Sequence, residues 1–236
     1  SFYNPAKGKY QYDAFNTNDS TIYFIKNKHI EWHHFTNKTT KTIHFSVDTA
    51  LYSQLFYAIY LDADGNFWTA SVHDASNPKK TKFGCLVKYH YPSGKTTVYP
   101  AGKGISFASS IVLDITCDAK GNVYLLNKFG VCQLNSGSGK TSVYYSNELL
   151  PDNTYVSMEL DAKNRLWLGT LTNGIVVYDI PTNKFILLKG QPTLLSNDML
   201  MQASTQDDNN HLYFWDVTGI NIFNANDIQF NLPQPK

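Results

Sequence analysis

The segment Asp161–Trp167, D-A-K-N-R-L-W, decides the fold because the chain repeats it. Copies without gaps are D-A-D-G-N-F-W (Asp62–Trp68), D-A-K-G-N-V-Y (Asp118–Tyr124) and D-D-N-N-H-L-Y (Asp207–Tyr213), and a weaker copy is T-N-D-S-T-I-Y (Thr17–Tyr23). In chain order the copies begin 45, 56, 43 and 46 residues apart. A repeat of this length, between about 20 and 50 residues, is typical of propellers and solenoids.

A second landmark recurs in every unit, an apolar or aromatic residue with a long polar residue six positions later. The five pairs are Phe35/Lys41, Tyr89/Lys95, Leu134/Lys140, Tyr178/Lys184 and Phe223/Gln229. The residues between the members of a pair include turn formers, as in Y-P-S-G-K and N-S-G-S-G-K, which favour a β-hairpin. The third full unit illustrates the pattern, with strands expected at 111–117, 123–126, 131–134 and 141–145.

Alternating polarity gives each four-stranded unit two partly apolar faces, which a lone sheet could not bury. Successive units are therefore expected to stack face to face around an axis. The sequence predicts an all-β chain, a β-propeller of about five four-stranded antiparallel blades that form a single region over residues 1–236. The repeat units are expected at about 10–45, 46–99, 100–145, 146–189 and 190–231.

Composition narrows the classes of function. Lys plus Arg number 20 and Asp plus Glu 19, so the net charge of +1 provides no basic field for binding nucleic acid. No run approaches the roughly 20 apolar residues that span a bilayer, so no membrane segment is expected in this chain. The three cysteines, Cys85, Cys117 and Cys132, form no C-x-x-C pair and are expected to be buried free thiols.

The fullest copy of the repeat extends from Asp161 to Phe185, as D-A-K-N-R-L-W-L-G-T and, three residues later, G-I-V-V-Y-D-I-P-T-N-K-F. It resembles the two-component regulator propeller repeat. The resemblance implies the sensor region of a hybrid two-component system of the Bacteroides type, in the periplasm, as the extracytoplasmic part of an inner-membrane protein. It also implies a non-catalytic role in sensing oligosaccharides, without a cofactor, and a signalling output outside this chain.

Both ends of the sequence resemble cuts in a longer chain. The interval from Tyr3 to Thr17 is 14 residues, whereas the matching step elsewhere is 27 to 29, so about one strand is missing or degenerate. The segment from Gly219 to Lys236 resembles the last blade before an immunoglobulin-like domain in such sensors. The expected partners are therefore the remaining blades and that domain of a parent chain, with a homodimer also considered and the closure of the ring left open.

The stretch D-A-D-G-N imitates the start of a calcium loop, with Asp62, Asp64 and Asn66 as alternate ligands. Other copies argue against this reading, because they place Lys120 and Lys163 where Asp64 stands. The first Asp is expected to cap its own turn instead.

Neither the histidines nor the known catalytic motifs predict a functional site in this sequence. His29, His33, His34 and His44 cluster in sequence, but His33 and His34 would point to opposite faces of a strand, so no metal site is expected. The sequence contains no G-x-S-x-G, H-E-x-x-H or phosphate-binding glycine loop, and an enzyme is not expected, although paired carboxylates could still meet in the fold.

Tryptophans divide into two kinds. Trp68 and Trp167 occupy equivalent positions and are expected to pack between blades. Trp32 and Trp215 have no such equivalence, and either could contact a ligand.

Recognition is expected on the face that carries the links between second and third strands and the connectors between blades, because these loops vary most. The candidate ligand-binding residues for an oligosaccharide are Tyr52, His73, Asp74, Lys128, Tyr155 and Asn173. Two alternatives stay open: a lyase or hydrolase similar to the streptogramin lyases, which share the D-x-x-G-N-h-W blade (h, apolar), and a pure protein-interaction platform.

Overall fold

A computed structural model describes residues 15–18, 21–26, 29–52, 56–71, 84–100, 111–127, 130–135, 137–145, 154–190 and 194–228. Its strands form five antiparallel sheets, and in each sheet the strands neighbour one another in chain order. The strands are β1 (Phe15–Asn18), β2 (Thr21–Lys26), β3 (His29–His34), β4 (Thr39–His44), β5 (Phe56–Leu61), β6 (Asn66–Ser71), β7 (Cys85–His90), β8 (Lys95–Pro100), β9 (Asp114–Cys117), β10 (Asn122–Asn127), β11 (Gly130–Asn135), β12 (Thr141–Tyr145), β13 (Tyr155–Leu160), β14 (Arg165–Thr170), β15 (Ile175–Asp179), β16 (Lys184–Leu188), β17 (Met199–Gln206), β18 (His211–Asp216) and β19 (Ile220–Asn224). One 3-10 turn, η2 (Ala225–Asp227), follows β19.

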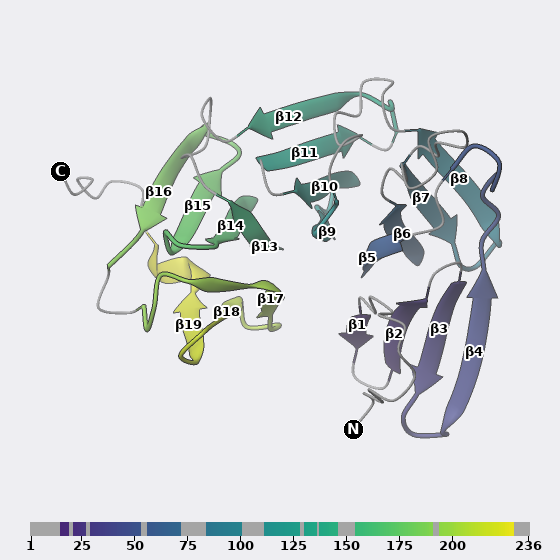
Figure 1. Cartoon of the computed structure of the whole chain (residues 1–236), viewed down its shortest axis with the longest axis horizontal. Coiled ribbons are helices and arrows are strands. Elements are labelled where there is room, and N and C mark those ends of the chain that lie inside the picture. Colours follow the sequence, from purple (N-terminus) through teal and green to yellow (C-terminus); the bar gives the residue numbers. More distant parts are fainter. Residues whose placement is uncertain are drawn as a thin grey trace.

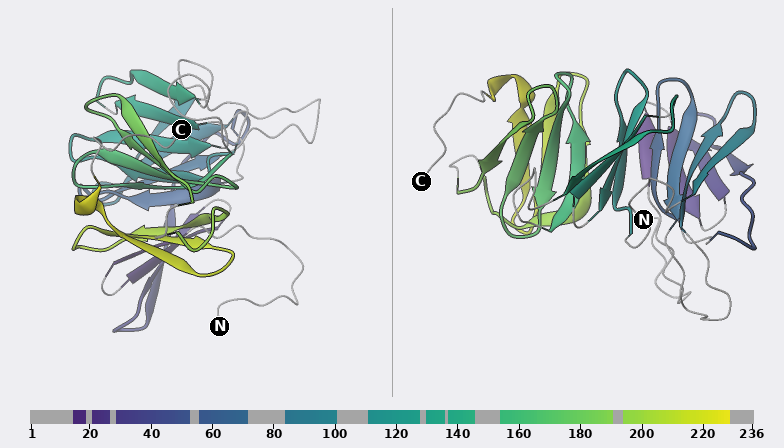
Figure 2. Two further views of the ribbon diagram at one scale, coloured as in Figure 1. Left: turned by 90° about the vertical axis from the view of Figure 1, so that its left-hand side faces the viewer. Right: turned by 90° about the horizontal axis from the view of Figure 1, so that it is seen from above.

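The sheets follow one another around an arc, with the first strand of each innermost (Figure 1). The innermost strands contact their neighbours in turn, from β1 to β5, β9, β13 and β17. Seen from above, the sheets stand side by side (Figure 2, right). The predicted all-β fold of propeller blades is confirmed, except that the fifth sheet has three strands rather than four within the described residues.

Apolar clusters fill each junction between consecutive sheets. The aromatic residue at the seventh position of the Asp motif faces the following blade: Trp68 packs against β9, β10 and β11, and Trp167 packs against β17, β18 and β19. These two indoles are 1% and 0% exposed, and burial of each contributes about 3 kcal/mol. The predicted packing role of Trp68 and Trp167 is confirmed.

The Asp motif forms a self-capped turn. In the fourth blade, Asp161 Oδ1 accepts hydrogen bonds from the backbone N–H groups of Lys163 (2.8 Å) and Arg165 (3.0 Å). Its Oδ2 accepts from Trp167 Nε1 at 2.9 Å and from Arg165 Nε at 2.6 Å. The equivalent carboxylates do the same, with Trp68 Nε1, Tyr124 OH and Tyr213 OH as the aromatic donors. The motif thus requires Trp or Tyr at its seventh position because the ring must donate a hydrogen bond.

The fourth motif position explains the Gly and Asn of the repeat. Gly65 and Gly121 have φ of 77°, and Asn164 and Asn210 have φ of 57° and 65°. Glycine and asparagine are the residues that adopt this left-handed conformation at least cost. In the second blade both oxygens of Asp62 accept hydrogen bonds within the motif, so the capped-turn interpretation of D-A-D-G-N is confirmed.

The cysteines are free, with Cys85 and Cys132 buried and Cys117 partly exposed. His33 and His34 do point to opposite faces of β3, because His33 Nε2 lies 3.2 Å from Glu31 Oε2 on one face while the even-numbered residues Ile30 and Trp32 join the cluster against the second blade. Within the described residues, no helix is both long and apolar enough to cross a membrane.

Candidate functional site in the central cavity

Three of the six residues expected to bind a ligand lie in the described part of the chain, and the structure does not bring them together. Tyr52 packs partly buried against the cluster between the first two blades. Tyr155 is 0% exposed, inside the cluster between the third and fourth blades. Asn173 lies at the link between β14 and β15, where its Oδ1 accepts a 2.6 Å hydrogen bond from Lys189 Nζ.

The remaining candidates, His73, Asp74 and Lys128, lie outside the described residues. Of the three described candidates, Tyr155 is enclosed in the blade interior, whereas Asn173 is only partly buried.

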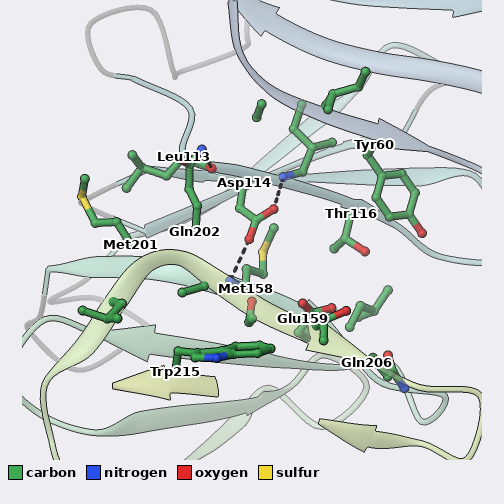
Figure 3. Close-up of a pocket in the computed structure, with 18 of the residues that line it drawn as sticks. Tyr60, Leu113, Asp114, Thr116, Met158, Glu159, Met201, Gln202, Gln206 and Trp215 are labelled. Atoms are coloured by element: carbon green, nitrogen blue, oxygen red, sulfur yellow. Dashed lines mark hydrogen bonds between the residues drawn. The ribbon is translucent and has the colours of Figure 1, made fainter. Parts of the chain in front are cut away.

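A cavity of about 1010 Å³ lies between the innermost strands of four blades. Strands β5, β9, β13 and β17 line it, and Trp215 of β18 completes the wall (Figure 3). Its polar lining includes Tyr60, Asp114, Thr116 and Glu159. The volume is that of a small-molecule site, and such sites combine apolar walls with a few directed polar groups.

Asp114 joins two blades at this cavity. Its Oδ2 accepts a 3.0 Å hydrogen bond from the backbone N–H of Met158 in β13, and its Oδ1 accepts from the N–H of Ile115 at 2.9 Å (Figure 3). Burial raises the pKa of Asp114 from 3.8 to about 7, although both N–H groups favour the charged form and oppose that rise.

Glu159 supplies a second carboxyl group from the neighbouring strand. Burial, with a smaller contribution from the negative charge of Asp114, raises its pKa from 4.5 to about 8. Two carboxyl groups of which at least one holds a proton near neutral pH can both donate and accept hydrogen bonds. That combination suits the hydroxyl groups of a ligand, each of which also donates and accepts.

Aromatic and amide groups stand beside the two carboxyl groups. Tyr60 of β5 and Trp215 of β18 line the cavity as flat surfaces (Figure 3). Gln202 and Gln206 of β17 add amides, and Gln206 Nε2 donates a 2.7 Å hydrogen bond to Asn210 Oδ1. Trp215, one of the two tryptophans expected to be free for a ligand, is thus at the cavity, whereas Trp32 packs on Tyr23 and Tyr91.

Sequence reasoning missed Asp114 and Glu159, although a signal was present. At four positions before the motif Asp, the other full copies have Ala58, Ser157 and Ala203 in place of Asp114. Comparing first strands would have marked both carboxylates as departures from the repeat. Within the described residues, no group of three or more His, Cys, Asp or Glu side chains is placed to hold a metal ion.

The blades and the axial cavity are those of a β-propeller, and solved structures share this fold. The extracellular domain of a hybrid two-component system from B. thetaiotaomicron superposes with a TM-score of 0.68 at 20% identity, over 98% of this chain and 31% of that one. The extracellular domain of a one-component system from the same organism gives 0.61 at 16%, over 92% and 28%. A catalytically inactive virginiamycin B lyase from Staphylococcus aureus, solved with quinupristin, gives 0.61 at 14%, over 95% and 73%.

Comparison with protein-family models identifies the kind of repeat. Residues 149–172 match the family described as the two-component regulator propeller. The matched segment contains all of β13 and β14, and it includes Glu159. The fourth blade therefore carries a two-component regulator propeller repeat. The chain spans 31% and 28% of the length of the two B. thetaiotaomicron extracellular domains, and the comparison with curated proteins gives no match.

Proposed function

We propose that this chain is the ligand-recognition propeller of an extracytoplasmic two-component sensor, that it is non-catalytic, and that it binds an oligosaccharide in the central cavity. The observation that carries the proposal is the regulator propeller repeat at residues 149–172, because the same segment contributes Glu159 to the cavity. The similarity to extracellular domains of sensors supports the periplasmic location.

The chemistry of the cavity supports a sugar ligand. Trp215 and Tyr60 offer aromatic faces on which the C–H face of a sugar ring can pack, and Asp114, Glu159 and Gln206 offer hydrogen-bonding groups around them. A longer ligand would extend from the end of the cavity near Leu113 toward the links between second and third strands. There it would meet residues of the loop face, for which Asn173, His73, Asp74 and Lys128 remain the proposed contacts.

Titration of an oligosaccharide panel by isothermal calorimetry tests this function. Trp215→Ala should weaken binding about tenfold, because the variant loses the stacking face. Phe185→Ala serves as the matched control, since Phe185 is an aromatic residue of the outer strand β16 that is 40% exposed and far along the sheet from the cavity. Equal affinities in the wild type and both variants would refute the cavity as the sugar site, and no binding by any panel member would refute the sensor proposal in this form.

A lyase activity is the second candidate, because the S. aureus lyase shares the fold over 95% of this chain. Chromatography of quinupristin incubated with the purified protein and divalent metal distinguishes the two functions. The sensor proposal expects the compound to elute unchanged, whereas a new product peak that requires the protein would favour the lyase.

The proposed partners are further blades and an immunoglobulin-like domain of a parent chain, and a homodimer of this chain. Light scattering of the purified chain after size exclusion measures its mass against the monomer mass of 26.7 kDa. A mass that stays at the monomer value across the concentration range would refute the homodimer.

A further inference from the structure

Strand β17 departs from the other innermost strands in one respect. The register of its pairing with β18 breaks between Met199 and Ser204, whose partners are Asp216 and Phe214. Four residues, Leu200–Ala203, therefore stand opposite the single residue Trp215. Strands β5 and β13 break register at the equivalent place with one extra residue each, Tyr57 and Val156. The bulge in β17 is an enlarged form of a feature that two other blades share.

The enlarged bulge reaches across the cavity. Gln202 Nε2 donates hydrogen bonds to the backbone oxygen of Leu113 at 2.7 Å and to that of Tyr57 at 3.3 Å. These two acceptors belong to the third and second blades, so one amide of the fifth blade joins three blades. Leu113 directly precedes Asp114, and Figure 3 shows Gln202 beside Leu113 at the margin of the cavity.

The backbone of this segment is strained and much of its side-chain surface is exposed. Gln202 adopts a φ of 53°, a left-handed conformation that costs a non-glycine residue on the order of 1 kcal/mol. The flanking Leu200 and Met201 are 41% and 61% exposed, so they gain little from burial. Bulges of this kind are common beside functional sites, where they redirect side chains. A strained and largely exposed segment, tied to the second and third blades through the amide of one side chain, is poised to open.

We infer that Leu200–Ala203 is a strap that closes the cavity at its Leu113 end and must release from Leu113 and Tyr57 when a ligand enters or leaves there. The inference rests on the proposed function, since it assigns the regulation of the same cavity. Release of the strap would also free the fifth blade from the second and third. Ligand occupancy would then change how three blades are tied together.

Methionine oxidation reports the strap directly, because each of the three methionines samples a different environment. Met201 lies in the strap, Met158 lines the cavity with 2% exposure, and Met199 is buried between blades with 1% exposure. The full chain is treated with dilute hydrogen peroxide, and sulfoxide formation at each methionine is followed by peptide mass spectrometry. In the wild type, Met201 should oxidise fast and Met158 slowly.

Gln202→Ala removes both cross-cavity hydrogen bonds and should raise the Met158 oxidation rate about fivefold while Met199 stays slow. Gln202→Glu keeps the size of the side chain but places a carboxylate against two carbonyl oxygens, so it should raise the rate at least as much at pH 8. Lys41→Ala is the matched control, because Lys41 Nζ also donates an exposed hydrogen bond between blades, at 2.7 Å to Tyr91 OH, but does not line the cavity. It should leave Met158 as in the wild type.

The strap would be refuted if Met158 oxidised at the wild-type rate in both Gln202 variants, or if Lys41→Ala raised the Met158 rate equally. Faster oxidation of Met199 together with Met158 would also overturn it, because the fifth blade would then be loosening as a whole. The measurement needs no ligand. Refutation of the strap would therefore leave the oligosaccharide titration as a separate test of the proposed function. A titration without binding would leave the conclusion from the oxidation rates unchanged.

Discussion

Glu159→Gln should remove a pH dependence of stability that originates in the cavity. The folded protein holds a proton on Glu159 up to about pH 8, whereas the unfolded chain releases it near 4.5. Between these values the folded state binds more protons, so the free energy of unfolding falls as pH rises through this window and levels off above it. Glutamine cannot ionise, and the variant should therefore lose this part of the slope.

The size of the effect follows from the pKa and the cavity. The interval from 4.5 to about 8, at about 1.4 kcal/mol per pH unit, sets an upper bound of ~5 kcal/mol. A cavity of about 1010 Å³ has ample room for water, which screens the carboxylate and reduces its cost. We therefore expect Glu159→Gln to be more stable than the wild type by about 1–2 kcal/mol at pH 8 and equal to it at pH 4.

Urea unfolding followed by circular dichroism at pH steps from 4 to 9 gives the two curves. Asp208→Asn is the control, since Asp208 is an exposed carboxylate of the turn at the edge of the same cavity. It should retain the wild-type slope. Wild-type and Glu159→Gln curves that superimpose between pH 5 and 8 would refute the protonated carboxyl group, and with it the argument that the cavity both donates and accepts hydrogen bonds near neutral pH.

Two further substitutions test the blade interior. Asp161→Ala should destabilise by about 3–5 kcal/mol in urea unfolding, because it leaves the guanidinium of Arg165, whose side chain is 4% exposed, without its counter-ion; a loss below about 1 kcal/mol would contradict the capped-turn account. Gly169→Ala should cost about 1–3 kcal/mol, because the added Cβ would lie 2.3 Å from Ser157 Oγ. Gly137→Ala, where the nearest atom would be at 3.6 Å, should be nearly neutral, and equal losses in both glycine variants would contradict the close approach of β14 to its neighbours.

The fold could be predicted because its information is repeated. The turn at Asp161 needs a carboxylate, a left-handed residue and a hydrogen-bonding aromatic ring at fixed spacing, and the chain contains that combination four times. A single copy of this motif would not define a fold. The period of about 45 residues between copies restricts the fold to a propeller or a solenoid. The fourth strand that the repeat predicts for the fifth sheet would begin at Gln229, which lies outside the described residues.

The site is less predictable than the fold, because the cavity is lined by strand residues rather than by the variable loops. Loop variability predicts a site at the links between second and third strands, where Asn173 lies. Tyr155 was included as a connector residue, yet it is the first residue of β13 and its ring has no exposed surface. A sequence pattern shows that a residue is close to a strand end but not whether its side chain faces the core or the solvent.

What the cavity residues share is departure from the repeat on strands that converge. Asp114 replaces the small residue found in three other blades, and Gln202 belongs to an enlarged bulge. Trp215 stands where the fourth blade has Gly169. The first strands of four blades line one cavity, so departures scattered over about a hundred residues of sequence meet in a single space. In a repeat protein of this geometry, the residues that recur in each unit build the blades, and the residues that depart from the repeat around the cavity set the chemistry of that cavity.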